Sequence, residues 1–299
     1  MIRTSRSEGA IDGSGRAGRR PPTGTGKNLI DTREKTSPGA EAGGNQPARA
    51  VLRTLTRLLS RYWTVLALVV AWAVWVRTQQ LNQIVAPTPA AVFGDVLGHP
   101  GAYLPDLGWT LLNAAVGLAL GMVLGVTGAL LVWASPLLSG LMTPMALIMR
   151  SVPVVAMIPV IARVVGFGVT AVLTITTVVS FFPVFVMAGS GLRAAPAATR
   201  DVFAVLAATR LTRLRLLLLP YAVPAVLVGL RLTASTAVLS AMLAEYLLGT
   251  HGLGRLFAQS VTFMDPARAW GTALVATVVS VLCFIGARAA ERLGTARFT

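Results

Sequence analysis

The sequence predicts an all-α, polytopic membrane protein with about six membrane-spanning helices, and three features of its composition support this fold class. Of the 299 residues, 55% are apolar and only 12% are charged, whereas a soluble domain carries about 25% charged residues. Residues 107–149 and 269–287 contain no charge at all. Stretches of this length can cross about 30 Å of hydrocarbon as helices. Finally, 12 of the 26 Lys and Arg residues precede the first apolar segment, within residues 1–61.

We expect a membrane domain over residues 59–295 that contains six membrane-spanning apolar segments. These segments cover residues 62–82, 109–134, 137–165, 168–190, 221–248 and 269–289. The first is short, because 15 residues separate Arg61 from Arg77, and both side chains would have to snorkel. The third is interrupted by Arg150, Pro153 and Pro159. We therefore expect a broken or re-entrant segment there.

The distribution of basic residues predicts the orientation in the plasma (inner) membrane. Residues 1–58 are polar and Gly/Pro-rich, which predicts a disordered tail. Lys and Arg number 12 in residues 1–61, none in 78–108, five in 193–215 and three from Arg288 onward. By the positive-inside rule, both termini and the 193–220 loop face the cytoplasm.

Several other function classes fail on detail. The basic charge is explained by topology, so we expect no nucleic-acid partner. Gly24-Thr25-Gly26-Lys27 ends like a phosphate loop, but Pro21 occupies the position of the first glycine and Asn28 that of the magnesium-binding hydroxyl. His99 and His251 are too isolated to suggest a metal site. Cys283, the single cysteine, lies in the last apolar segment. We therefore expect no enzyme, catalytic residue, metal or bound cofactor.

The 193–220 loop is the most informative segment. Asp201 is its only acid, and it is followed by apolar residues at helical spacing and by three arginines, which predicts an amphipathic helix over 201–215. Two interpretations remain open from periodicity alone. The helix either lies at the membrane interface with topogenic arginines or docks onto a cytosolic partner.

This loop resembles the cytosolic loop of the permease subunits of ATP-binding-cassette importers. That loop begins Glu-Ala-Ala, has a Gly four residues after the second Ala, and closes with Ile-x-Leu-Pro. Alignment on the closing Leu-Pro places these positions, in order, on Asp201, Val202, Phe203, Ala207, Leu217, Leu219 and Pro220. The spacing is kept, but Ala207 replaces a glycine, which would bring a methyl group to a bend with positive φ.

Further motifs resemble the branch of this family that imports nitrate, taurine and alkanesulfonates. In chain order they are Ala86-Pro87-Thr-Pro89, Arg150-Ser-Val-Pro153 with Ile158-Pro159, Gly166-Phe-Gly168, Gly229-Leu230-Arg231, Ala244-Glu245 and Gly249-Thr-His-Gly252-Leu253-Gly254. The resemblance covers residues 60–295 in family order, with only the tail outside it. It implies the fold of a type I importer permease.

The resemblance also implies a set of partners. These are an ATP-binding cassette subunit that hydrolyses ATP, an extracytoplasmic solute-binding protein, a second permease copy in a homodimer, and the lipid bilayer. Asp201 would be the charged contact to the ATPase, while Phe203, Leu206 and Leu211 would fill its groove. The solute-binding protein would largely set the identity of the cargo, which we expect to be a small anion.

Charges within the apolar segments are candidates for the translocation pathway, together with Pro153 and Pro159. A charge deep in a membrane helix is costly unless it is paired or wetted. Arg231 and Glu245 are 14 residues apart, so they share one helix face. Either that face points into the bundle or the pathway, or each side chain extends to the membrane surface nearest to it. The positive charge of Arg150 would suit an anionic solute.

A stripe of small residues, Gly117, Gly121 and Gly125, predicts close helix packing within or between subunits. An ion-coupled secondary transporter is the alternative function, because such proteins carry midplane charges. The sequence shows no repeat of one half in the other. A membrane-anchored scaffold would leave Arg231 and Glu245 unexplained.

Overall fold

A computed structural model of the chain describes residues 63–141, 144, 153–249 and 251–296, and every regular element in these ranges is helical. The predicted tail, residues 1–58, and Arg150 lie outside the described residues. A helix over Trp63–Thr78 comes first. The elements that follow it are α2 (Pro89–Gly98), α3 (Pro100–Ala134), α5 (Val154–Val165), α6 (Val169–Arg193), α7 (Ala197–Val205), α8 (Arg210–Arg213), the π-helix η1 (Leu214–Leu218), α9 (Leu219–Leu248), α10 (Leu253–Thr262) and α11 (Pro266–Thr295).

Four helices are long and apolar enough to cross a membrane, namely α3, α6, α11 and the continuous helical stretch Arg210–Leu248 that ends in α9. The helix Trp63–Thr78 and α5 are apolar but shorter. The described part of the chain is therefore an all-α, multi-pass membrane protein. The count of six spans stays a prediction.

The interrupted third segment contains α5, which has 12 residues. Such a helix is about 18 Å long at 1.5 Å per residue, too short to cross about 30 Å of hydrocarbon. Pro153 lies at its N-cap, and Pro159 lies inside it, where it removes a backbone hydrogen bond. Both prolines are exposed.

The glycine stripe packs α3 against α6 within the same subunit. A Cβ atom added to Gly117 would lie 2.6 Å from the Thr176 Cβ, and one added to Gly121 would lie 2.5 Å from the Ser180 Cβ. These distances are far below van der Waals contact, so only glycine lets the two backbones approach this closely. The predicted role in helix packing is confirmed.

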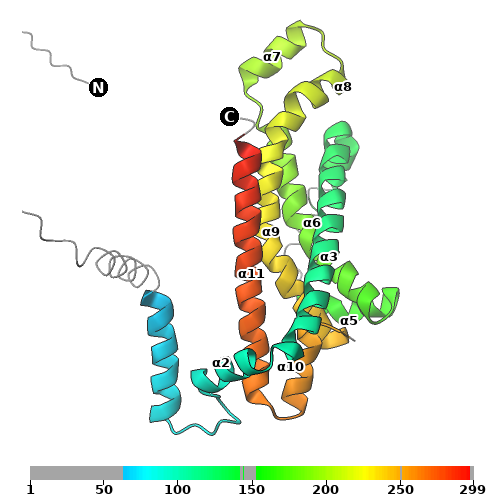
Figure 1. Cartoon of the computed structure of the whole chain (residues 1–299). Helices are drawn as coiled ribbons and strands as arrows, with labels where there is room; N and C mark the ends of the chain where they lie inside the picture. The colour runs from blue at the N-terminus through cyan, green and yellow to red at the C-terminus, as the bar shows by residue number, and fades with distance from the viewer. Residues whose placement is uncertain (1–62, 142–143, 145–152, 250, 297–299) are drawn as a thin grey trace, which may run out of the picture. The chain divides into compact units, whose positions relative to one another are not determined.

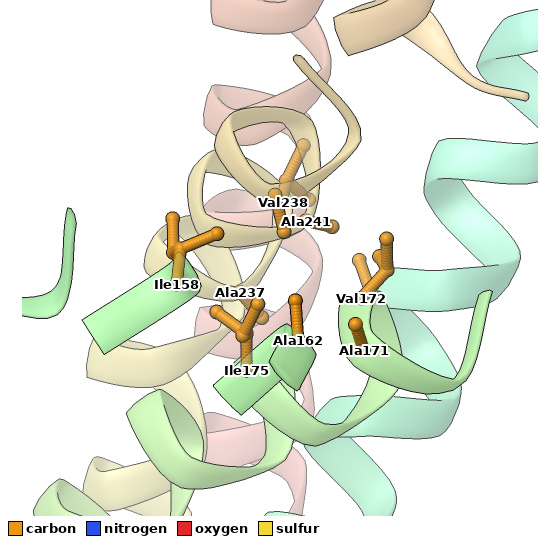
Figure 2. Packing of buried hydrophobic residues seen from close by; sticks show 10 residues of the cluster. Ile158, Ala162, Ala171, Val172, Ile175, Ala237, Val238 and Ala241 are labelled. Atoms are coloured by element: carbon orange, nitrogen blue, oxygen red, sulfur yellow. The ribbon is translucent and has the colours of Figure 1, made fainter. Parts of the chain in front are cut away.

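A second small-residue contact holds α5, α6 and α9 together (Figure 2). Ile158 and Ala162 from α5 meet Ile175 from α6 and Ala237 from α9, and all four are buried. The short α5 is thus fixed by packing on one face.

The two ends of the bundle carry different elements (Figure 1). The α7–α8 hairpin projects at one end, while α2 and α10 lie at the other. The end of α11 lies with the hairpin, because a Cβ added to Gly294 would lie 2.4 Å from Leu227 Cδ1, near the start of α9.

Candidate functional site

The predicted docking loop is a pair of helices joined by a turn. The prediction of one helix over 201–215 is wrong, because α7 ends at Val205 and α8 begins at Arg210. Ala207 breaks the helix with φ +48°, which is the positive φ expected from its glycine position in the family pattern. Thr209 then caps α8, since its hydroxyl accepts a 3.2 Å hydrogen bond from the Thr212 N–H.

The tip of this hairpin exposes its apolar side chains. Val202, Leu206 and Leu211 are 55%, 70% and 55% exposed, and Asp201 is exposed beside them. Phe203 is only partly buried, against a core at the base of the hairpin. Exposed apolar side chains grouped in this way mark a surface for another molecule.

The stem of the hairpin is firmly anchored. Leu217 in η1 is 2% exposed and packs with Leu192 and Ala222 from the adjoining long helices. The Leu219 N–H donates to the Leu214 carbonyl, the wider spacing of a π-helix. Leu219 and Pro220 then begin α9, half-buried. The loop is therefore continuous with a membrane helix.

The first of the two predicted pathway charges on α9 is part of an ion pair between helices. Arg231 Nη1 lies 3.0 Å from Glu291 Oε2, on α11, and the two side chains are 29% and 15% exposed. Pairing with a carboxylate reduces the cost of holding a guanidinium among apolar helices.

Glu245, the second predicted charge, is buried in a network of hydrogen bonds at the opposite end of α9. It is 1% exposed. Its Oε2 accepts a 2.6 Å bond from the Thr110 hydroxyl, and its Oε1 accepts a 2.9 Å bond from Asn113 Nδ2. The Gly254 N–H, at the start of α10, also donates to Oε2, at 3.3 Å. Three elements thus meet at one carboxyl group.

An ion pair extends this network along α3. Arg255 Nη2 lies 2.9 Å from Asp106 Oδ2, and the Gly252 N–H donates a 2.9 Å bond to Asp106 Oδ1. The Leu253 N–H donates to the Thr110 hydroxyl oxygen at 2.8 Å. The backbone N–H groups of Gly252, Leu253 and Gly254, which have no partner within the helix, are thus each bound by a side chain.

The turn before α10 requires glycine. Gly252 has φ +105°, and a Cβ added there would lie 2.2 Å from the Glu245 carboxyl carbon. A Cβ on Gly254 would lie 2.0 Å from the Met242 carbonyl oxygen. The Gly-Leu-Gly motif therefore lets the backbone close around the carboxyl group.

A cavity of about 520 Å³ lies on a different face of α9, and we call it the α9 cavity. It is lined by Val179, Thr236, Leu239, Ser240, Met242, Leu243, Tyr246 and Phe257. Neither Arg231 nor Glu245 is among these residues. The shared helix face predicted for the two charges points into the bundle, toward α3 and α11.

Comparison with known proteins gives the family. Residues 117–297 match the family described as "Binding-protein-dependent transport system inner membrane component". The chain belongs to this family. It is a permease component of a transport system and a multi-pass membrane protein.

Three curated relatives show how far this similarity extends. A probable ABC transporter permease protein of Haemophilus influenzae is 28% identical over 231 residues, which are 76% of this chain and 93% of the relative. The taurine transport system permease protein TauC of Escherichia coli is 25% identical, over 80% of this chain and 86% of the relative. The putative aliphatic sulfonates transport permease protein SsuC of Bacillus subtilis is 27% identical, over 71% of this chain and 78% of the relative.

Solved structures confirm the fold of the permease. The MetNI methionine ABC transporter in an inward-facing conformation matches with a TM-score of 0.55 at 22% identity, covering 62% of this chain and 92% of that one. An amino acid ABC transporter crystallised with histidines matches with a TM-score of 0.56 at 17% identity, covering 66% of this chain and 95% of that one. The fold is that of a type I importer permease.

Sequence reasoning identified Glu245 and Arg231 in the permease but missed their partners. Glu291 is an isolated acid near a predicted helix end, and its distance from Arg231 in sequence hides the pairing. Thr110 and Asn113 carry no charge and lie inside an apolar run. Their spacing of three residues on one helix face is the one available signal, and it is weak because threonine and asparagine are common.

A further polar cluster ties α2 to the start of α11. Arg268 Nη2 lies 3.1 Å from Asp95 Oδ1, and the Tyr103 hydroxyl and His99 Nδ1 also contact this carboxylate. Burial raises the pKa of Asp95, but hydrogen bonds from Arg268 and Tyr103 outweigh it and hold the pKa below its usual value. Among the described residues, no group of His, Cys, Asp and Glu is arranged to hold a metal.

Proposed function

We propose that the permease forms the membrane pathway of an ATP-driven importer, with ATP hydrolysed on a separate ATP-binding cassette subunit. The observation that carries this proposal is the α7–α8 hairpin, with its exposed apolar tip on an anchored stem. Such a helix pair transmits displacement, because a packed core moves as a body. The family favours this function over an ion-coupled secondary transporter.

The proposal includes the remaining components of the complex. A second copy of the permease would complete the pathway, and an extracytoplasmic solute-binding protein would deliver the solute. Both termini and the hairpin would be cytoplasmic, as the positive-inside rule predicts. The contact between Gly294 and Leu227 supports this orientation, since it puts the end of α11 at the hairpin end of the bundle.

A small anion is the proposed cargo. The relatives that support this class are named as permeases for taurine, aliphatic sulfonates and nitrate. Uptake of radiolabelled taurine, methanesulfonate and nitrate by cells that express the whole transporter tests it. The prediction for Arg150 adds a variant, since Arg150→Gln should lower the rate or affinity of anion uptake. Unchanged transport and affinity in that variant would remove Arg150 from the pathway.

Asp201 provides the test of coupling. Asp201→Arg should leave the permease monodisperse but lower ATP-dependent uptake at least tenfold, because the reversed charge meets the partner's docking groove. Asp201→Glu is the matched control, since it keeps the charge and should keep uptake. Wild-type uptake by Asp201→Arg, with the ATPase still co-purifying, would refute the docking assignment.

A further inference from the structure

The Glu245 network anchors one short helix, α10, to the rest of the permease. Side chains of α3 and α9 bind the backbone at its first turn, through Asp106, Thr110 and Glu245. Arg255 adds an ion pair with Asp106. Acidic groups suit this position, because the N-terminus of a helix carries a partial positive charge.

The anchored helix carries one wall of the α9 cavity. Phe257 lies one helical turn after Gly254 and packs edge-on against Tyr246, with ring centroids 5.6 Å apart and an interplanar angle of 68°. Both rings line the cavity. From Tyr246 to Thr236 the cavity follows α9 for ten residues, about 15 Å at 1.5 Å per residue. The aromatic pair therefore bounds the cavity at the α10 end of the bundle.

The cavity lining is mostly apolar, with a few hydroxyl-bearing side chains among its residues. Thr236 and Ser240 are among its lining residues, and each hydroxyl donates to a carbonyl of its own helix. The other lining side chains are apolar or aromatic, so the lining as described is uncharged. A pathway must bind its solute weakly enough to release it, and hydroxyl groups without a fixed charge meet that condition for an anion.

We propose that Glu245 is a positioning residue for transport, because its carboxyl group fixes α10 and thereby holds the Tyr246–Phe257 pair across the outer end of the solute path. This inference rests on the proposed function, and it takes the α9 cavity to be part of the path. It assigns a task to a buried acid that lies outside the cavity. Glu245 acts through the two aromatic rings and does not touch the solute.

The chemistry of the network predicts graded effects of substitution. Glu245→Ala removes both acceptor oxygens, so the Thr110 hydroxyl, the Asn113 amide and the Gly254 N–H all lose a partner. Glu245→Gln keeps the shape and one oxygen, and the Asn113 amide can turn to offer its own oxygen to the new amide group. Alanine should therefore release α10, whereas glutamine should largely hold it.

A cysteine in the cavity reports the release. In a Cys283→Ala background, Thr236→Cys places the single thiol at the far end of the cavity from the aromatic pair. A membrane-impermeant maleimide is then applied from outside to the whole transporter in sealed vesicles. Glu245→Ala should raise the rate of modification at least tenfold, and Glu245→Gln less than threefold. Glu291→Ala is the matched control, because it removes a mostly buried acid at the other end of the bundle, and should leave the rate unchanged.

Labelling from the cytoplasmic side separates positioning from general loosening. In inside-out vesicles, the rate in Glu245→Ala should stay within twofold of the parent. An equal rise from both sides overturns the inference, as does an unchanged outside rate in a monodisperse Glu245→Ala protein. A thiol that reacts from neither side and instead forms a disulfide with a second copy shows that the partner fills the cavity, which also overturns it. Failure of the unmodified chain to co-purify with an ATPase would refute the proposed function, independently of any labelling result.

Discussion

The Thr110 hydroxyl donates a 2.6 Å hydrogen bond to Glu245 Oε2, although 135 residues separate the two in sequence. The same hydroxyl oxygen accepts a 2.8 Å bond from the Leu253 N–H. Thr110 is fully buried, so water cannot replace it readily. One small side chain on α3 thus connects the end of α9 to the start of α10.

Thr110→Val should destabilise the permease. Valine keeps the shape but removes one of the three hydrogen bonds to the Glu245 carboxyl and leaves the Leu253 N–H without its side-chain acceptor, at a cost of about 1–3 kcal/mol for a buried polar group. Thr110→Ser keeps the hydroxyl and should cost less. Thermal unfolding in detergent checks both variants. Equal midpoints for valine and serine would show that the hydroxyl contributes nothing.

Gly121→Ala should also lower stability, by separating two helices. The new methyl group would lie 2.5 Å from the Ser180 Cβ and 2.9 Å from the Thr177 carbonyl oxygen, and overpacking of this kind costs about 1–3 kcal/mol. Gly108→Ala is the matched control on the same helix, because nothing lies within 4 Å of its Cβ position. There alanine should stabilise the helix by about 0.5–1 kcal/mol. The two midpoints should therefore move in opposite directions.

The ion pair between Arg231 and Glu291 can be measured by a double-mutant cycle. Arg231→Gln and Glu291→Gln should each destabilise the protein, and the double variant should be less affected than their sum, with a coupling of about 0.5–3 kcal/mol. Arg288 is exposed on the same helix as Glu291. A cycle of Arg288→Gln with Glu291→Gln should show a weaker coupling, about 0.2–0.5 kcal/mol for charges three residues apart on a helix, and equal coupling in both cycles would contradict a specific pair.

The parts of the fold that sequence could predict are those controlled by hydrophobicity and sterics. The glycine stripe predicted close packing because only a missing Cβ allows it, and the structure places it against α6. The prolines at 153 and 159 predicted an interruption, and α5 is indeed short. Such signals are local, so a single chain is enough to detect them.

The candidate site was only half predictable, because its contacts are not local. Glu245 is conspicuous as a charge in an apolar helix, but Thr110 and Asn113 are ordinary polar residues until α3 is placed beside it. Periodicity also misjudged the docking loop. Apolar spacing continues across Ala207, while the backbone turns there at positive φ, and hydrophobic spacing alone contains no signal for that turn.

Ala207 gives the last prediction. Its φ of +48° is a conformation in which a side chain is unfavourable and glycine is not, a difference of about 1 kcal/mol. Ala207→Gly should therefore stabilise the turn between α7 and α8 and slow hydrogen exchange of its backbone amides. Uptake should be retained, because no contact of the hairpin tip is removed.

Ala204→Gly is the control for this prediction. Ala204 is exposed within α7, where glycine costs about 0.5–1 kcal/mol relative to alanine. The same substitution three residues apart should thus speed exchange at position 204 and slow it at 207. If glycine speeds exchange at both positions, the turn does not hold Ala207 at positive φ, and the hairpin geometry that presents Asp201 to its partner would have to be revised.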